Sequence, residues 1–426
     1  MPRFTSFLLC LLAIPAASVL ANKVTVREDR TLLVDGKPLF PIGLYYAEEE
    51  IAEPTGALLK DLRATGFNTV FFHTGGKPDD PTKARLDRIA AAGMHVQFRP
   101  PGDLMGSWDE LEKTVAAFRD HPAMLFWEHG DEPTVNKTPF EPSRQGYERM
   151  KKLDPDHPVL CVQFPFWTQP EEMRKWGTAC DVYAFDKYPV PLKRWHYRVK
   201  DLPEGWPHSV AIMGTLTQWW QSLVPGKPVI PVMQAWAWQP TVDGMAGYPT
   251  PEQSRFMAYH VVIRGAKGIL YYGKMRVSRP HTASGIPPQI DPDPTKAAAD
   301  FAKAKELNAW FWEGFKPVVK ELDEMAPVFT AADADWKPRV ELVGATEAKP
   351  AQIECRVKRH EEGWVVLLVN ASEHAATVKL TAPPFKGSSV WAWRPGREIK
   401  ADEQGSFVEQ LEPFAVRVYR RPAARP

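Results

Sequence analysis

The stretch Ala123-Met-Leu-Phe-Trp-Glu-His-Gly-Asp-Glu-Pro133 decides how the rest of the chain is interpreted. Its apolar run from Met124 to Trp127 is short and uncharged, which is typical of a strand buried on both faces. A glycine then allows the chain to turn, and the closing proline cannot continue a ladder of hydrogen bonds. Two adjacent carboxylates, Asp131 and Glu132, are therefore expected where a buried strand ends. An ordinary strand-to-helix loop with solvated acids has the same pattern, so the other strands must decide.

Seven more strand-like runs accompany this one, and helical stretches separate them. Each run ends in polar or aromatic residues; the runs are Pro41–Tyr46, Thr69–His73, Met94–Arg99, Val159–Phe164, Asp181–Asp186, Val229–Gln234 and Gly268–Tyr272. Amphipathic segments at 57–65, 82–92 and 108–119 predict helices. Eight strand–helix repeats predict an α/β fold, a closed (β/α)8 TIM barrel. An open doubly wound sheet is disfavoured, because no G-x-G-x-x-G follows the first strand.

The two ends of the chain differ from this rhythm. Residues 1–21 combine Arg3, an apolar core and a small-residue site at Val19-Leu-Ala21, which predicts a signal peptide and a secreted or periplasmic protein. Residues 24–40 predict a hairpin that precedes the first barrel strand. The barrel domain, with this hairpin included, is therefore expected at 22–326. After a linker at 327–336, apolar residues recur at every second position, as in strands with one buried face. Six short strands starting near 339, 352, 364, 376, 389 and 414 predict a small antiparallel β-sandwich at 337–421.

Composition excludes several function classes. The 53 basic and 52 acidic residues leave no net field that would attract nucleic acid or an anionic membrane surface. Once the signal peptide is cleaved, no segment is long and apolar enough to span a membrane. Cys161, Cys180 and Cys355 show no metal-ligand spacing, so buried free thiols are expected, with a Cys161–Cys180 bridge as the alternative. We expect neither a metal nor a cofactor.

Active sites of such barrels lie at the carboxyl ends of the strands, so the last residues of each run matter most. No Gly-rich phosphate loop follows the last two strands, and no His-x-His follows the first. The residues at the strand ends combine acids with hydrogen-bonding and aromatic side chains, which suits the hydroxyls and apolar faces of sugars. A carbohydrate is therefore the expected substrate. Residues predicted to bind it are Tyr46, His73, Arg99, Asp131, Tyr188, Gln234, Trp236 and Tyr272.

The opening Val34-Asp-Gly-Lys-Pro-Leu-Phe-Pro-Ile-Gly43, the fourth-strand Gly-Asp-Glu-Pro133 and the C-terminal sandwich resemble the (β/α)8 glycoside hydrolases of clan A. That resemblance covers nearly the whole mature chain and implies hydrolysis of a glycosidic bond. It places the general acid/base at Glu132, with Asp131 where the clan usually has Asn. The clan's nucleophile is a Glu at the end of strand seven, and this chain has Gln234 there, which cannot form a covalent glycosyl-enzyme.

Three interpretations of this departure remain open. Asp186 at the end of strand six is the second carboxylate, about 6–10 Å from Glu132, which favours an inverting mechanism. Alternatively, the substrate or one of the loop acids at 48–50 supplies the missing group. In the third interpretation the barrel only binds glycans. A polysaccharide lyase using His73 and Tyr272 is a more distant alternative. Glu128, inside strand four, is expected to point into the barrel and to pair with Arg99.

Overall fold

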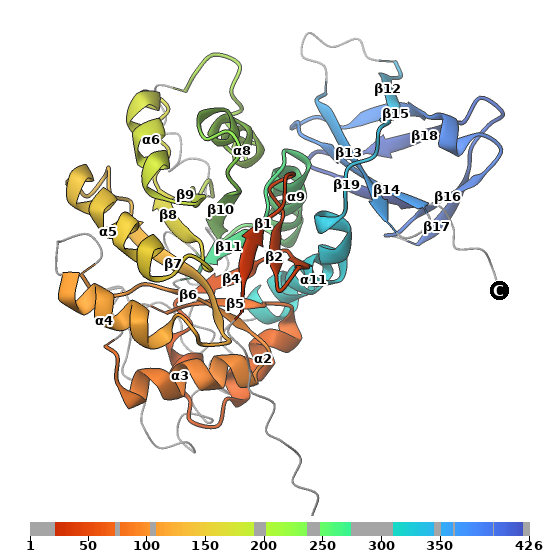
Figure 1. The fold of residues 1–426 in the computed structure, drawn as a ribbon. Helices are drawn as coiled ribbons and strands as arrows, with labels where there is room; N and C mark the ends of the chain where they lie inside the picture. The colour runs from red at the N-terminus through yellow and green to blue at the C-terminus, as the bar shows by residue number, and fades with distance from the viewer. Residues whose placement is uncertain are drawn as a thin grey trace, which may run out of the picture.

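The computed structural model describes residues 22–72, 77–102, 108–190, 202–236, 248–273, 310–344, 351–360, 363–394 and 396–420. The predicted signal peptide at 1–21 and the predicted site residue His73 lie outside them. The described residues form a closed parallel barrel followed by two antiparallel sheets (Figure 1). The predicted fold class, a TIM barrel followed by a β-sandwich, is confirmed.

The eight barrel strands follow one another around the closed sheet in chain order. They are β4 (Ile42–Tyr45), β5 (Thr69–Phe72), β6 (His95–Phe98), β7 (Met124–Asp131), β8 (Val159–Gln163), β9 (Val182–Asp186), β10 (Val229–Gln234) and β11 (Ile269–Tyr272). Seven of them begin and end within one residue of the predicted limits. The exception is β7, which runs four residues further than its apolar stretch.

Helices cover the outside of the barrel. They include α1 (Glu48–Ala52), α2 (Ala57–Thr65), α3 (Asp80–Ala91), α4 (Trp108–Phe118), α5 (Phe140–Leu153), α6 (Pro170–Trp176), α8 (Ile212–Leu223), α9 (Pro251–Ile263) and α11 (Lys316–Thr330). The helices predicted at 57–65, 82–92 and 108–119 are confirmed. The second of these starts two residues early because the Asp79 side chain accepts a hydrogen bond from the Thr82 backbone and caps it.

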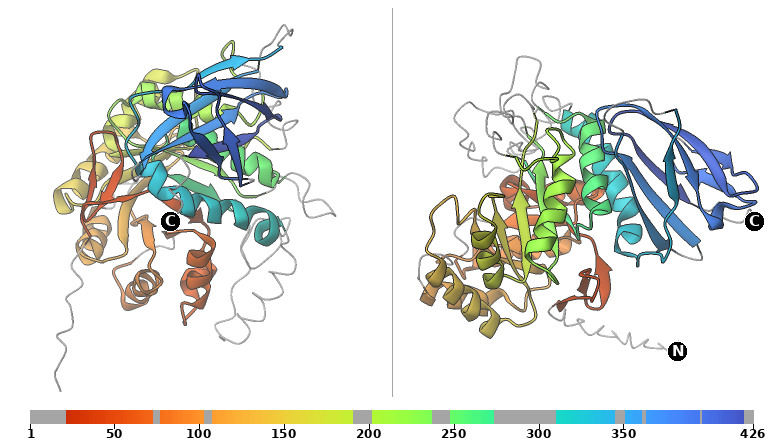
Figure 2. Two further views of the ribbon diagram at one scale, coloured as in Figure 1. Left: turned by 90° about the vertical axis from the view of Figure 1, so that its right-hand side faces the viewer. Right: turned by 90° about the horizontal axis from the view of Figure 1, so that it is seen from above.

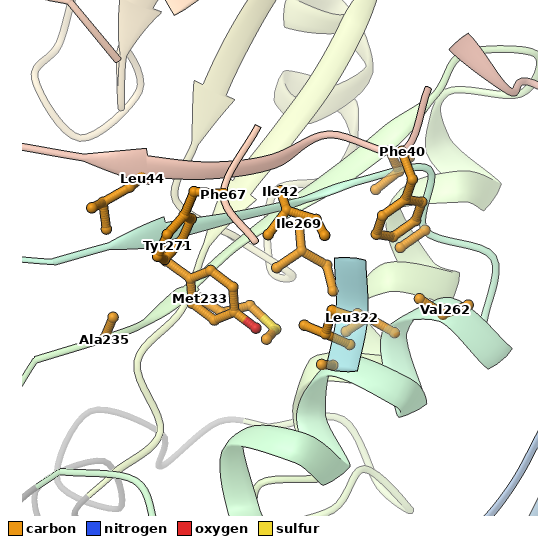
Figure 3. Close-up of a cluster of buried hydrophobic side chains, with 14 of the residues drawn as sticks. Phe40, Ile42, Leu44, Phe67, Met233, Ala235, Val262, Ile269, Tyr271 and Leu322 are labelled. Atoms are coloured by element: carbon orange, nitrogen blue, oxygen red, sulfur yellow. The ribbon is translucent and has the colours of Figure 1, made fainter. Parts of the chain in front are cut away.

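Except in β7, where Leu125 and Phe126 both belong to the inner layer, alternate residues of the barrel strands enter one of two apolar layers. Figure 3 shows the outer layer, where Met233 of β10 and Ile269 of β11 pack near Leu322 of α11. Ile230 and Val232 of β10 belong instead to the layer inside the barrel. This alternation explains why the strands read as continuous apolar runs, since both faces are buried.

A three-stranded antiparallel sheet precedes the barrel and consists of β1 (Val24–Val26), β2 (Leu32–Val34) and β3 (Lys37–Leu39). Its residues Val24 and Leu32 pack into the layer inside the barrel. The backbone of Val24 also donates to Asp156, just before β8 begins. The sheet therefore closes the amino-terminal end of the barrel and leaves the other end for a site.

Strand β7 contains a bulge at the point where the acids follow. Glu128 lies opposite Leu160, whereas Asp131 lies opposite Val162, so β7 has one residue more than β8 between these pairs. Gly130 supplies the left-handed backbone that this requires, with φ at 81°. The extra residue breaks strict alternation and turns Asp131 toward the same side as Glu128.

The C-terminal sandwich contains eight strands in the described residues. One sheet holds β12 (Arg339–Leu342), β15 (Ala376–Thr381) and β18 (Ser406–Leu411), and the other holds β13 (Ile353–His360), β14 (Gly363–Asn370), β19 (Val416–Arg420), β16 (Ser389–Ala392) and β17 (Arg397–Lys400). The sequence did not predict β17 or β18. Their patterns hide them, because β17 is a mostly charged edge strand and β18 buries Glu409 while exposing Val408.

Helices α9 and α11 lie between the barrel and the sandwich (Figures 1 and 2). Glu321 of α11 is buried there and accepts hydrogen bonds from Arg255 and from the Tyr259 hydroxyl. Glu354 of β13 likewise pairs with Arg264 of α9. Helix α11 ends at Thr330, so the first four residues of the expected linker are helical.

The three cysteines of the described chain are free, as expected, and the alternative Cys161–Cys180 bridge is not formed. Burial raises the pKa of the Cys180 thiol to about 12, which makes it a poor nucleophile. No helix among the described residues is sufficiently long and apolar to cross a membrane.

Candidate active site

An acid pair, Glu132 and Asp186, lies where strands four and six of the barrel end. Asp186 is the last residue of β9 and is only 6% exposed, whereas Glu132 is half-buried. The two carboxyl groups are hydrogen bonded to each other. Burial, followed by the negative charge and the hydrogen bond of Glu132, holds the pKa of Asp186 well above its usual range. The pair therefore retains a proton that an isolated aspartate would lose.

The predicted separation of about 6–10 Å between these carboxyl groups is wrong, since they are in contact. The β7 bulge is the physical reason, because its extra residue shifts the end of β7 along β8, beyond which β9 ends in Asp186. Glu132 then adopts a left-handed backbone, with φ at 45°, and its N–H donates to Val162 at 3.0 Å. A glutamate seldom adopts this conformation, so the end of β7 holds a strained residue at the candidate site.

A second buried acid lies deeper in the barrel. Glu128 is fully buried, accepts hydrogen bonds from the Tyr45 hydroxyl at 3.2 Å and from Gln97, and lies 3.9 Å from Arg99. The expected pairing of Glu128 with Arg99 is confirmed. Burial and then the Glu128 charge hold the pKa of Tyr45 well above its usual range, so this phenol stays protonated and donates. Arg99, predicted to bind sugar, thus also neutralises the acid beneath the site.

Gln97 is a site residue that the sequence analysis missed. It lies on β6 two positions before Arg99, is buried, and also donates to the Tyr45 hydroxyl at 2.6 Å. A polar residue in the middle of a buried strand, on the same face as Arg99, was the available signal.

Aromatic side chains surround the acid pair. The rings of Tyr46 and Tyr272 meet edge to face with centroids 5.0 Å apart, and their hydroxyls lie 3.3 Å apart. Tyr188 lies 5.3 Å from Tyr272 and 5.6 Å from Trp236 by ring centroids. Burial and then the charge of Asp186 raise the pKa of Tyr188. The four predicted aromatic residues thus form one wall beside the acids.

Asp131 faces the same space. Its negative charge helps to raise the pKa values of Tyr46, Tyr188, Tyr272 and Asp186, although burial is the larger cause for each. Asp131 is exposed, so it can reach solvent or a ligand. The bulge therefore presents two neighbouring carboxylates at the mouth.

The loop acids considered from the sequence fall on helix α1. Glu49 and Glu50 are buried, whereas Glu48 is half-buried. Burial is the main cause that raises the pKa of Tyr46, and the charges of Asp131 and Glu48 add to it. Glu48 therefore lies close enough to the aromatic wall for its charge to act on Tyr46.

Gln234 ends β10 at the position where the clan carries its nucleophile. Its side chain is 1% exposed and its amide bonds to backbone groups of Val190 and Trp236. The predicted role of Gln234 in sugar binding stays a prediction. Among the described residues, no group of three or more His, Cys, Asp or Glu side chains could hold a metal ion.

Comparison with known families and structures agrees with this architecture. The family model of the Glyco_hydro_42 beta-galactosidases matches residues 135–310, less than half of the chain. The matched segment includes Asp186 and Gln234 and begins three residues after Glu132. No curated protein matches the sequence.

Solved structures show the same fold at low sequence identity. A glycoside hydrolase family 5 protein from Bacteroides vulgatus is 15% identical, with a TM-score of 0.59 and 93% of each chain covered. Another structure, titled "Glycoside hydrolase", is 13% identical, with a TM-score of 0.58 and coverage of 95% of this chain and 98% of that one. At such identities these likenesses establish the fold alone. The family model therefore relates part of the barrel to glycoside hydrolases, and the solved structures show that nearly the whole chain has the fold of such enzymes.

Proposed function

We propose that this chain hydrolyses a glycosidic bond in an oligo- or polysaccharide, with Glu132 as general acid and Asp186 as the second carboxylate. The observation that carries the proposal is the hydrogen-bonded acid pair beside a wall of four aromatic rings. Sugar rings stack on such faces, and the scissile oxygen needs a proton donor.

The difference in exposure assigns the two roles. Glu132 is half-buried and Asp186 nearly fully buried, so Glu132 is the member that a glycosidic oxygen can approach. In the free enzyme the shared proton lies on Asp186; as the pair opens the proton passes to Glu132, which delivers it to the leaving oxygen as the bond to the anomeric carbon breaks. The ionised pair then takes a proton back from the attacking water through Asp186. Atoms balance, because one water is consumed and the proton is returned.

The contact between the two carboxyl groups sets a condition on this reaction. Retaining glycosidases hold their carboxyl groups roughly 5–5.5 Å apart and inverting ones roughly 6.5–9.5 Å. The acid pair is closer than either, so the entering sugar must separate it before Asp186 can reach water. In the free enzyme the Glu132–Asp186 pair therefore holds the proton, and substrate binding makes that proton available at the glycosidic oxygen.

The first experiment measures reducing-sugar release from a glycan panel, beginning with β-galactosides because the matching family model is described as beta-galactosidase. Wild-type protein is expected to release sugar, and Glu132→Gln and Asp186→Asn to release none while keeping the native circular dichroism spectrum. Glu48→Gln is the matched comparison, because Glu48 is a carboxylate on α1 beside Tyr46. Loss of activity in Glu48→Gln but not in Asp186→Asn would move the second carboxylate to α1.

A catalytically inactive glycan-binding barrel is the second candidate, and the amide at Gln234 favours it. Calorimetric binding of oligosaccharides without any turnover, unchanged by Glu132→Gln, would support this function and refute hydrolysis.

We also propose that residues 1–21 are a signal peptide and that the mature protein is secreted or periplasmic. Mass spectrometry of the exported protein is expected to find an amino terminus at Asn22. An intact Met1 in exported protein would contradict it.

A further inference from the structure

Gln234 makes three hydrogen bonds, two of which a carboxylate could not make. Its Oε1 accepts from the Val190 N–H at 2.9 Å, and its Nε2 donates to the Val190 carbonyl at 2.6 Å and to the Trp236 carbonyl at 2.8 Å. An ionised glutamate has no N–H, so it would lose both donated bonds and face two carbonyl oxygens. The amide is therefore chemically required where it lies.

These bonds extend the pairing of two strands beyond the end of the sheet. The β9–β10 ladder ends with Asp186 opposite Val232, and the Lys187 N–H still donates to the Val232 carbonyl at 3.3 Å. Gln234 then pairs with Val190 through both its donor and its acceptor, as a backbone residue would. The segment Lys187–Val190 is thus held at both ends.

That segment carries part of the candidate site. Asp186 immediately precedes it, and Tyr188 within it contacts the rings of both Trp236 and Tyr272. Because Gln234 also bonds to the Trp236 carbonyl, one amide holds the backbone of Trp236 directly and that of Tyr188 through Val190, two residues further along the chain.

We propose that Gln234 is a positioning residue of the active site: its amide holds Tyr188 and Trp236 as a sugar-stacking surface. This inference rests on the proposed function, and it explains the missing strand-seven carboxylate without loss of catalysis. The catalytic carboxylates lie on strands four and six, and strand seven supplies the clamp that keeps the strand-six loop in place. Gln234 thereby orients the aromatic rings on which a pyranose stacks.

The test compares Gln234→Glu and Gln234→Met, the second of which keeps the length but makes no hydrogen bonds. Both variants are expected to raise KM about tenfold or more, because leaving these backbone groups without partners distorts the platform, while kcat changes less. Hydrogen exchange followed by mass spectrometry is expected to show faster exchange of a peptide spanning 187–190.

Asn370→Asp is the matched control, since this buried amide also bonds to backbone groups, but in the sandwich. It is expected to lower stability while leaving KM and the exchange of 187–190 unchanged. Equal or higher kcat in Gln234→Glu, with unchanged KM, would overturn the proposal and make strand seven a latent nucleophile position. Unchanged exchange at 187–190 in Gln234→Met would also overturn it. The exchange result does not depend on turnover, so it separates failure of this inference from failure of the proposed hydrolysis.

Discussion

Asp186→Asn is expected to make the protein inactive and, near neutral pH, more stable. Asp186 is nearly fully buried, and its carboxyl is hydrogen bonded to Glu132. Asparagine has the same shape, needs no proton, and donates from its amide to the Glu132 carboxylate. It therefore imitates the protonated aspartic acid, but it cannot act as a base.

The size of the effect follows from proton linkage. Folding raises the pKa of Asp186, so the folded protein holds this proton more tightly than the unfolded chain. The stability from this group is complete below about pH 4 and is lost as the pH rises toward the raised pKa. The loss is at most about 1.4 kcal/mol per pH unit, hence at most about 4 kcal/mol between pH 4 and pH 7. The variant does not suffer this loss.

The assay is thermal and urea unfolding of wild type and variant between pH 4.5 and pH 8. The stability difference in favour of Asp186→Asn is expected to grow with pH. Asp181→Asn is the control, because Asp181 lies just before the other end of β9, where its carboxylate accepts from the Val159 N–H and the Tyr147 hydroxyl. It is expected to destabilise the protein with no such growth. A stability difference for Asp186→Asn that stays constant across the pH range would refute the shared proton.

Three further results are expected. Glu132→Gln should lower kcat by about 100-fold or more, as loss of a general acid does, with unchanged thermal unfolding as the check on its fold; a fall of less than about threefold would end the assignment. Trp236→Ala should raise KM more than it lowers kcat, measured by steady-state kinetics, because it removes one ring of the wall. Burial alone would raise the pKa of Glu354, but hydrogen bonds from His260 and Arg264 lower this pKa to about 2. The ionised Glu354 therefore stabilises the folded protein above about pH 4.5, and this contribution is lost as the pH falls toward 2. Glu354→Gln should therefore cost about 3 kcal/mol in urea unfolding at pH 7 and much less near pH 2; equal costs at both pH values would contradict this.

Local pattern was sufficient to predict the barrel. Strands buried on both faces read as short apolar runs, and helices with one buried face read as periodic ones, so seven strands were located within one residue. The strand ends, and with them most of the candidate site residues, followed from the rule that such barrels carry their sites at the carboxyl ends. Glu128 could also be paired with Arg99, because a charge inside a barrel needs a partner at a neighbouring strand end.

The sequence by itself thus determined the fold class, the strand order and the acidic, aromatic character of the mouth, because these depend on periods of two and 3.6 residues within single segments. Only the tertiary structure decided that Glu132 meets Asp186, because Gly130 permits a bulge but the register against the neighbouring strand sets where it forms. The same holds for Gln234, whose role depends on the backbone of Val190, 44 residues away along the chain. Contacts between distant segments are set by how the barrel closes, and no single stretch of sequence encodes that closure.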